Sequence, residues 1–410
     1  MGAGVVAAVM GAAKTHGWAV SVRGGGHSPF CTKDDAVLLD MSAHFNDAHL
    51  DDATIVAGAG ATMGDILQAG AAEHRVVPVG KFGTPGMGLA LQGGVGSLAR
   101  KFGLTIDHLA EIELVLPSGD IRILSPESTG DDAELWWGSR GAGPNFGVVT
   151  SAKFRTHVLE SVLSVQRLTT MSRLSAVLNW AAGGGPEVTT SLILGSLSGG
   201  EPALLVDVVS TQSGSGRADL NRDLSEVVGV EAPPSFEFES SCAHADLPPF
   251  LLPDIRGAKT PPKDVMSGVY VRCPMLRAEF DFTEVADIFS AALSNAPTAN
   301  CWIEMQQMGG AVAEVERTAT AFWNRNSSWS VPITAGWSSP GDRGACEEWV
   351  RDTERALESF ISGYYSVEAR PGTDQTAADV DAAFGDNISR LSNLKRSVDP
   401  SNILRCYYPF

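Results

Sequence analysis

The sequence predicts an α+β protein built from two domains, and three observations support this prediction. The 410 residues are 44% hydrophobic and 19% charged, a composition with which a chain of this length buries a sizeable core. Residues 1–157 combine short strands with glycine-rich loops, whereas strands and amphipathic helices alternate from about Leu159. That alternation is typical of an antiparallel sheet backed by helices. We therefore expect one domain over residues 1–157 and a second over residues 158–386.

The first domain is expected to open with a helix of small apolar residues over 5–16 and a strand over 18–22. Further along, the turn residues Pro117-Ser118-Gly119-Asp120 separate two apolar runs. This pattern predicts a β-hairpin with strands at 111–116 and 121–124. The other expected elements are strands at 36–40, 53–57 and 147–154 and helices at 63–74 and 131–137.

The second domain is expected to contain strands at 161–169, 189–197, 203–210, 269–272, 301–308 and 328–337. Amphipathic helices are expected at 217–228 and 345–362, with proline- and glycine-bearing loops over 232–262. Residues 377–404 are predicted to be helical up to Asp399-Pro400, because proline cannot continue a helix.

Charge and hydropathy limit the classes of partner. Thirty Lys and Arg against 48 Asp and Glu give a formal charge of −18, which repels phosphate backbones and anionic membrane surfaces. The sequence has no apolar run of the roughly 18 residues that a transmembrane helix needs. No basic leader precedes the apolar N-terminal stretch, so we expect no cleaved signal peptide, and the compartment stays open. The oligomeric state is also open.

The six cysteines are scattered along the chain without a CxxC pair or a Cys/His cluster. Structural zinc is therefore not expected, and no metal site is predicted. We expect free, buried thiols instead.

The segment Gly58-Ala59-Gly60-Ala61-Thr62-Met63-Gly64 follows a strand and opens a helix, as a Rossmann dinucleotide fingerprint would. That fingerprint requires an acidic residue roughly 20 positions on, at the end of the next strand. Residues 75–80 contain no carboxylate. We therefore interpret the segment as a strand-to-helix turn of another α+β fold.

The strongest local signal is Arg23-Gly24-Gly25-Gly26-His27-Ser28. Three successive glycines remove side chains, so that backbone N–H groups can converge on an anion such as a pyrophosphate. Arg23 can add charge-assisted hydrogen bonds, and His27 follows as a nucleophile or hydrogen-bonding group. The alternative is an exposed turn with an incidental histidine, because short glycine motifs are common.

A second glycine-rich segment spans residues 80–96, with seven glycines in GKFGTPGMGLALQGGVG. Such a segment suits neither a helix nor a regular strand, and it is expected to lie against a large flat ligand. Together with the loop at 23–28, it could hold the two ends of one dinucleotide. A third such segment, Arg140 to Val149, leads into the strand that closes the first domain.

At this point the chain resembles the FAD-binding domain of the vanillyl-alcohol oxidase / p-cresol methylhydroxylase (PCMH) superfamily, and within it the berberine-bridge-enzyme-like branch. The resemblance covers about two thirds of the chain, and the ordered set of motifs is more specific than any one of them. The motifs are Arg23 to Ser28, Gly80 to Leu104 with Asp107-His108, Asp131 to Trp137, Asn145 to Val149, Gly309-Gly310, Thr320-Ala321-Phe322 with Arg325, Phe384 to Asn387, Arg390-Leu391, Lys395, and Asp399 to Asn402.

This resemblance implies a two-domain PCMH-type fold, in which residues 1–157, completed by 387–410, bind FAD and residues 158–386 form an antiparallel-sheet substrate domain. It implies that His27 bonds covalently to the flavin, whereas Phe82 stands where many relatives have a second, cysteinyl link. The residues implied to contact the cofactor are Arg23, Gly24, Gly25, Gly26, His27, Ser28, Thr84, Gly88, Leu89, Gly93, Gly94, Gly96, Asp107, His108, Gly147, Val148 and Val149.

The sequence departs from the family at the catalytic positions. Ala383 stands where relatives often carry a tyrosine base, and Val331 aligns with a glutamate of the berberine bridge enzymes. Neither side chain can remove a proton. We therefore consider Tyr364, Tyr365 and Glu304 as candidate catalytic residues, with packing or a surface position as the alternative for each. The usual terminal asparagines are replaced by Tyr407 and Tyr408.

The resemblance implies a flavin-dependent oxidase that takes a hydride from a small organic or secondary-metabolite substrate bearing an alcohol or amine, with O₂ as the reoxidant. The absent base motivates an alternative, namely a flavoprotein without redox activity that shapes a cavity for cyclisation or ligand binding. A soluble NAD-dependent enzyme is a third hypothesis.

Overall fold

The computed structural model describes residues 2–28, 31–197, 201–229, 236–247, 266–368, 377–405, 407–408 and 410. The chain divides into two compact units. Unit 1 comprises Met1–Glu160, Glu314–Arg325 and Ser366–Phe410, and unit 2 comprises Ser161–Ala313 and Asn326–Tyr365. Relative to the expected boundaries, residues 314–325 and 366–386 lie with the N-terminal unit.

A five-stranded antiparallel sheet forms the centre of unit 1. Its order is β3 (Ala48–Asp51), β4 (Thr54–Gly58), β8 (Val148–Arg155), β6 (Leu109–Val115) and β7 (Ile121–Leu124). The predicted hairpin is present as β6 and β7, with Val115 opposite Ile121. Strand β8 occupies the middle of the sheet, where its Phe154 is completely buried. Strand β3 was not predicted from the sequence.

Short elements complete unit 1. A two-stranded parallel sheet joins β1 (Ala19–Arg23) to β2 (Ala36–Asp40), and β5 (Arg75–Val76) pairs with β9 (His157–Val158). Helix α1 (Ala3–His16) ends at Gly17, which has a φ of 69°. Helix α2 (Met63–Ala71) begins at a capping box between Thr62 and Asp65 and ends three residues earlier than predicted. The 80–104 segment contains only the one-turn helices α3 (Met87–Ala90) and α4 (Ala99–Phe102).

The C-terminal helical region of unit 1 is broken where one helix was predicted. Helices α11 (Ala377–Phe384) and α12 (Ile388–Val398) are separated by Gly385, which has a φ of 49°. Glycine tolerates this left-handed conformation, and its hydrogen leaves room for the Trp323 ring. Helix α5 (Asp131–Ala142) continues beyond the predicted segment as far as Ser139, and it is kinked at Arg140 and Gly141, whose backbone angles are not helical.

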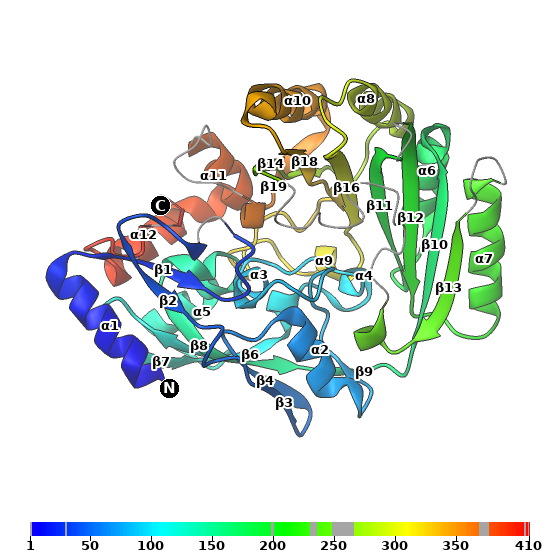
Figure 1. Ribbon diagram of the computed structural model, residues 1–410. Coiled ribbons are helices and arrows are strands. Elements are labelled where there is room, and N and C mark those ends of the chain that lie inside the picture. The colour runs from blue at the N-terminus through cyan, green and yellow to red at the C-terminus, as the bar shows by residue number, and fades with distance from the viewer. Residues whose placement is uncertain are drawn as a thin grey trace. The chain divides into compact units, whose positions relative to one another are not determined.

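Unit 2 contains the predicted antiparallel sheet, which has ten strands within the described part of the chain. Its main path runs β13 (Glu237–Cys242), β10 (Val162–Thr170), β12 (Pro202–Ser210), β11 (Val188–Ser196), β16 (Cys301–Gln307), β17 (Trp329–Ser330), β15 (Pro274–Leu276) and β19 (Ile361–Tyr364), and β14 (Gly268–Arg272) pairs with β18 (Ile333–Trp337). Helices α6 (Leu174–Gly183), α8 (Phe282–Ser294) and α10 (Arg343–Ala356) contribute to the core cluster on one face of this sheet, and α7 (Ser215–Val228) packs beside α6 and β10 (Figure 1).

Three expected elements of unit 2 differ from the structure. The helix expected over 345–362 ends at Ala356, and residues 361–364 instead form β19. The strand expected over 328–337 is divided at Val331-Pro332, because proline has no N–H for the sheet ladder. The loops expected over 232–262 contain β13, while residues 232–235 and 248–262 lie outside the described part.

Five of the cysteines lie in the described ranges, and all five are free thiols. Cys273, Cys301 and Cys346 are buried, as expected, whereas Cys31 and Cys242 are half-buried. Within the same ranges, no group of three or more His, Cys, Asp or Glu side chains could hold a metal ion. The described helices are also too short or too polar to cross a membrane.

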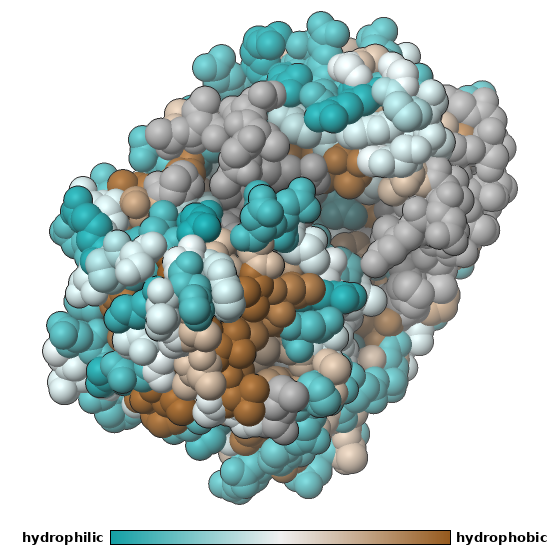
Figure 2. Space-filling view, turned by 60° about the vertical axis from the view of Figure 1, so that its left-hand side comes forward, coloured by the Kyte–Doolittle hydropathy of each residue, from teal (hydrophilic) through white to brown (hydrophobic). Residues whose placement is uncertain are grey.

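Some large apolar side chains of unit 1 are exposed. Val5 of α1 and Trp18 just after it are each 48% exposed, and Leu38 of β2 is 43% exposed. An apolar area interrupts a largely polar surface in the view of Figure 2. These three residues are not among those implied to contact the cofactor.

Candidate functional site

The structure brings the first two glycine-rich segments together in unit 1. A Cβ atom at Gly25 would collide with the backbone nitrogen of Gly86 and lie 2.7 Å from the carbonyl oxygen of Thr84. A Cβ at Gly86 would in turn collide with the backbone nitrogen of Gly25. The two backbones therefore interlock at a distance that only glycine allows. Segments some sixty residues apart in sequence thus lie in direct contact, and their joint role in holding a dinucleotide stays a prediction.

Hydrogen-bond donors accumulate on the first loop. Among the described residues, the Gly25 and Gly26 amides have no hydrogen-bond acceptor. Gly26 has a φ of 75°, which turns the chain back toward the Arg23 side chain. The Arg23 guanidinium donates to Asp40 Oδ2 at 3.2 Å and is exposed, as is His27, while Ser28 is half-buried. The two amides and the exposed guanidinium are donors that suit an anionic ligand, and His27 is exposed directly after them.

The second loop divides into an exposed part and a packed part. Thr84 and Gly88 are exposed and Leu89 is half-buried, so a ligand can reach them. Gly93, Gly94 and Gly96 are buried. At Gly94 a side chain would collide with Thr105, and at Gly96 with the carbonyl oxygen of Val79. Close packing alone therefore requires glycine at these two positions, and contact of the three with a cofactor stays a prediction.

Asp107 and His108 each form hydrogen bonds with other residues of unit 1 in this structure. Arg325, whose side chain is completely buried, donates to both carboxylate oxygens of Asp107 at 2.7 Å. Asp107 also accepts the Leu104 amide at 2.9 Å. This bidentate pair ties the 314–325 segment to the end of the second loop. The sequence analysis singled out Arg325 as part of a family motif, but it did not predict that Arg325 pairs with Asp107.

His108 forms a short contact with a second histidine. Its Nδ1 lies 3.0 Å from the Leu104 carbonyl oxygen, and its Nε2 lies 2.7 Å from Nε2 of His157. A carbonyl only accepts, so Nδ1 carries the hydrogen of neutral His108 and its Nε2 accepts from His157. Burial, chiefly, lowers the pKa of His108 to about 4, with a smaller contribution from His157. Burial also lowers the pKa of His157, on whose ring Phe102 stacks at 4.1 Å.

The third segment is part of the central sheet. Val148 and Val149 are buried in β8, and a Cβ at the preceding Gly147 would lie 2.7 Å from the Val115 carbonyl oxygen. Gly58 and Gly60, which resembled a Rossmann fingerprint, pack against the backbone of residues 41–45. This close approach explains why glycine stands at both positions without a bound dinucleotide. It agrees with our rejection of the Rossmann interpretation.

The three candidate catalytic residues lie in unit 2. Glu304 and Tyr364 lie on opposite faces of its sheet. Glu304 of β16 pairs with Ile193, which belongs to a small apolar cluster with Ala203 and Leu205. Its neighbours in the strand, including Ile303, point to the helix-covered face and join the main core. Glu304 therefore lies on the face away from α6, α8 and α10.

Tyr364 lies on the helix-covered face instead. Arg272 stacks over its ring at 5.0 Å, and the same arginine forms a buried, bidentate ion pair with Glu354 of α10, with contacts of 2.8–3.0 Å. Burial, followed by the hydrogen bond to Glu354, raises the pKa of Tyr364 far above its usual value. A phenol that holds its proton this firmly is a poor general base. Tyr365, which follows β19, is 5% exposed, and its amide donates to the Cys273 carbonyl.

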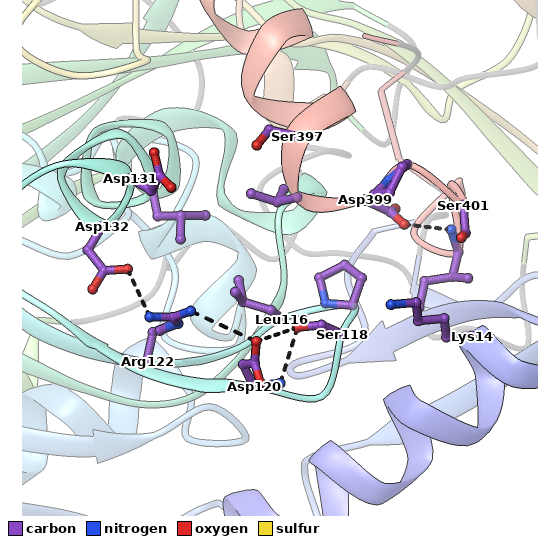
Figure 3. Close-up of a pocket in the computed structure, with 15 residues that line it drawn as sticks. Lys14, Leu116, Ser118, Asp120, Arg122, Asp131, Asp132, Ser397, Asp399 and Ser401 are labelled. Carbon is purple, nitrogen blue, oxygen red and sulfur yellow. Dashed lines mark hydrogen bonds and ion pairs between the residues drawn. The ribbon is translucent and has the colours of Figure 1, made fainter.

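A cavity of about 310 Å³ lies elsewhere in unit 1, among α1, the β6–β7 turn, α5 and the end of α12. Arg122 stands between Asp120 and Asp132 in this cavity, 3.8 Å from each (Figure 3). Lys14 and Ser401 also line it. None of the residues predicted from the sequence to bind cofactor or to act in catalysis lines this cavity.

Comparison with known proteins gives a consistent result. Residues 3–125 match the FAD binding domain family. An FAD-linked oxidoreductase of Dictyostelium discoideum is 26% identical over 395 residues, which cover 94% of this chain and 81% of that protein. Berberine bridge enzyme-like 19 of Arabidopsis thaliana is 25% identical over 444 residues, covering 98% and 75%. The structure of 6-hydroxy-D-nicotine oxidase from Arthrobacter nicotinovorans superposes with a TM-score of 0.82 at 24% identity, covering 99% and 90%.

The residues present suit an FAD group. The Gly25 and Gly26 amides have no acceptor among the described residues, and the Arg23 side chain lies next to Gly26, an arrangement that suits a pyrophosphate. Arg23 supplies positive charge, and the exposed imidazole of His27 follows directly. Thr84, Gly88 and Leu89 offer accessible contacts on the second loop.

Proposed function

We propose that this chain, which belongs to the PCMH-type, berberine-bridge-enzyme-like flavoproteins, is an FAD-dependent oxidase of a small organic substrate. Its relatives are named FAD-linked oxidoreductases, and the chain is an oxidoreductase with an FAD binding domain. The observation that carries the finer proposal is the interlocked pair of glycine loops with His27 exposed beside it. We assign cofactor binding to unit 1 and substrate binding to unit 2.

In this proposal FAD is held by the loop Arg23–Ser28 and by Thr84, Gly88 and Leu89, and it is covalently attached through His27. Bound FAD would accept a hydride from the substrate, and O₂ would reoxidise it with release of H₂O₂. The protein's contribution is to fix the cofactor with backbone amides, which are preorganised by the packing at Gly25. Arg23 neutralises phosphate charge while its contact with Asp40 restrains the guanidinium.

The substrate would be a small molecule carrying an alcohol or amine, or a secondary metabolite undergoing oxidative cyclisation. Of the candidate bases, we retain Glu304 and Tyr365. Tyr364 is omitted, since its hydroxyl is committed to Glu354 on the helix-covered face. Glu304 is half-buried, and a carboxylate is one of the side-chain types that serve as general bases.

The absent base favours a second candidate function, namely a flavoprotein that binds or cyclises a ligand without net oxidation. Val331 and Ala383 are both buried, and neither side chain has a group that can take up a proton. Anaerobic mixing with candidate substrates separates the two functions. Bleaching of the flavin band supports oxidation, whereas product formation without bleaching supports the second function.

The mass and visible spectrum of the intact, denatured protein test the cofactor assignment. Wild type is expected to carry the mass of one FAD and a yellow colour, and the His27→Ala variant should lose the attached mass. His49→Ala serves as a control, because this exposed histidine lies on β3, away from the glycine loops. Protein without bound or reconstitutable flavin would refute the proposal, and attached FAD that survives His27→Ala would refute the linkage.

A further inference from the structure

We propose that Tyr407 and Tyr408 are positioning residues, which hold the two glycine loops in the geometry that binds FAD. The inference rests on the proposed function, because it takes these loops as the cofactor site. The family resemblance described above implies only that asparagines are replaced at both positions. Their hydroxyl groups, however, each bond to one of the two loops or to the strand that leads into it.

Tyr407 acts on the first loop through β1. Its hydroxyl oxygen accepts the Val22 N–H at 3.0 Å, one residue before Arg23, and the Tyr407 side chain is 7% exposed. One edge of β1 pairs with β2, and at the other edge the Val20 N–H donates to the Ile403 carbonyl at 2.8 Å. The terminal segment thus takes the place of a neighbouring strand. The phenol fixes the last part of the backbone before the glycines begin.

Tyr408 acts on the second loop through Gln92. Its hydroxyl donates to Gln92 Oε1 at 2.6 Å and also contacts the Ser366 carbonyl oxygen. The Gln92 side-chain amide then donates to the Gly88 carbonyl at 3.0 Å. Tyr408 and Gln92 are 3% and 5% exposed, whereas Gly88 is exposed. A buried phenol is therefore connected by two hydrogen bonds to a loop residue that a ligand can reach.

The backbone that carries Tyr408 is itself held in place. The Tyr408 amide donates to Asn145 Oδ1 at 3.0 Å, and Lys395 Nζ donates to the Asn145 carbonyl at the same distance. Lys395 is further bound to Asp399 at 2.7 Å. An anchored phenol of this kind can restrain a loop, because its own position is fixed independently of that loop.

Hydroxyl and ring make separable contributions. The Tyr408 ring packs against Phe384 and Phe410, with centroids 5.2 Å and 5.9 Å away, and phenylalanine would preserve both contacts. The hydroxyl contacts, including the bond to Gln92, would be lost. If the tyrosine served packing alone, Tyr408→Phe would leave the cofactor site unchanged. If it positions the second loop, the same variant should alter FAD binding while the fold persists.

The test measures FAD binding by the full chain in a His27→Ala background, where FAD can equilibrate. Flavin fluorescence gives the Kd, and the visible spectrum and reduction potential of bound FAD report its surroundings. One hydrogen bond corresponds to a roughly three- to tenfold effect, so Tyr407→Phe and Tyr408→Phe should each raise the Kd by about that factor. Both variants should also shift the flavin band. Tyr270→Phe is the matched control, a buried tyrosine of unit 2 at 7% exposure.

Unchanged Kd, spectrum and potential in both phenylalanine variants would overturn the inference, even if the unfolding temperature fell. Should Tyr408→Phe fail to fold, Gln92→Met removes the same connection from the loop side and decides the matter. Failure of the underlying function is distinct, since the His27→Ala parent would then bind no FAD at all.

Discussion

Acidification is expected to destabilise unit 1 through His108. The folded protein holds this side chain neutral, with a pKa of about 4 against 6.5 for an unperturbed histidine. The unfolded chain therefore takes up a proton near pH 6.5 that the folded chain refuses until about pH 4. Stability from this group is fully present above pH 6.5 and is lost as the pH falls toward 4. The difference of 2.5 pKa units corresponds to about 3 kcal/mol, at roughly 1.4 kcal/mol per unit.

The hydrogen-bond geometry explains why protonation is costly. Neutral His108 accepts from His157 at Nε2 and donates from Nδ1 to the Leu104 carbonyl. A proton added at Nε2 would face the hydrogen that His157 already directs there. Arg155, whose charge also lowers the pKa of His108, lies close by, and Asp107 opposes it only in part because Arg325 neutralises that carboxylate.

Urea unfolding at pH 7, 6, 5 and 4 measures this effect in wild type and in His108→Gln. Glutamine cannot titrate, so the difference in unfolding free energy between the two proteins should change by about 3 kcal/mol from pH 7 to pH 4. Tryptophan fluorescence follows the transition, since Trp136 and Trp137 are buried in α5 of unit 1. Parallel stability curves across this range would refute the assignment of the acid sensitivity to His108.

Three further predictions concern the loops, the ion pair and the tyrosine. Gly25→Ala should abolish FAD retention and cost roughly 1–3 kcal/mol of stability, because the added methyl group collides with the Gly86 backbone. Flavin content and thermal unfolding measure these effects. Gly11→Ala in α1 is the control, because its methyl group meets nothing within 4 Å. Asp107→Asn should cost roughly 3–5 kcal/mol in urea unfolding, since it leaves the buried Arg325 charge uncompensated, and a loss below about 1 kcal/mol would contradict this account. Tyr364→Phe should leave the pH profile of kcat/KM unchanged up to about pH 10, because the raised pKa keeps this phenol protonated throughout. If the variant instead lost the fall in kcat/KM on the alkaline side of the profile, Tyr364 would again be a candidate base.

The elements that sequence analysis could predict have strong local signals. The β6–β7 hairpin follows from its turn residues, and α2 begins at the Thr62–Asp65 capping box. By contrast, β3 has the sequence Ala-His-Leu-Asp, whose polar residues hide its pairing with β4. Strand β19 follows α10 so closely that the sequence pattern led us to predict a continuous helix over 345–362. Long-range pairing with β15 decides its conformation, and no short window contains that information.

The candidate site shows the same division. The density of glycine in residues 23–28 and 80–96 is enough to indicate both loops. The face on which Tyr364 lies could not be predicted, because a shift of one residue in strand register reverses every side chain. Strand β19 pairs with β15 across such a shift, between Met275 and Leu276. The position of Tyr364 beside Arg272 and Glu354 therefore follows from tertiary pairing. The place of Tyr364 in the sequence, just before the C-terminal helices, does not indicate this position.

The glycines show why a ligand-binding signal in a sequence is incomplete evidence. Gly25 lacks a side chain because the Gly86 backbone lies against it, and Gly96 because the Val79 carbonyl does. At Gly88 nothing lies within 4 Å of an added Cβ, so packing gives no reason for glycine there. Gly88 is also exposed and its carbonyl accepts a hydrogen bond from Gln92, and its contact with FAD stays a proposal. Gly88→Ala should consequently weaken FAD binding without lowering the unfolding temperature of the cofactor-free protein, a combination that a packing glycine would not produce.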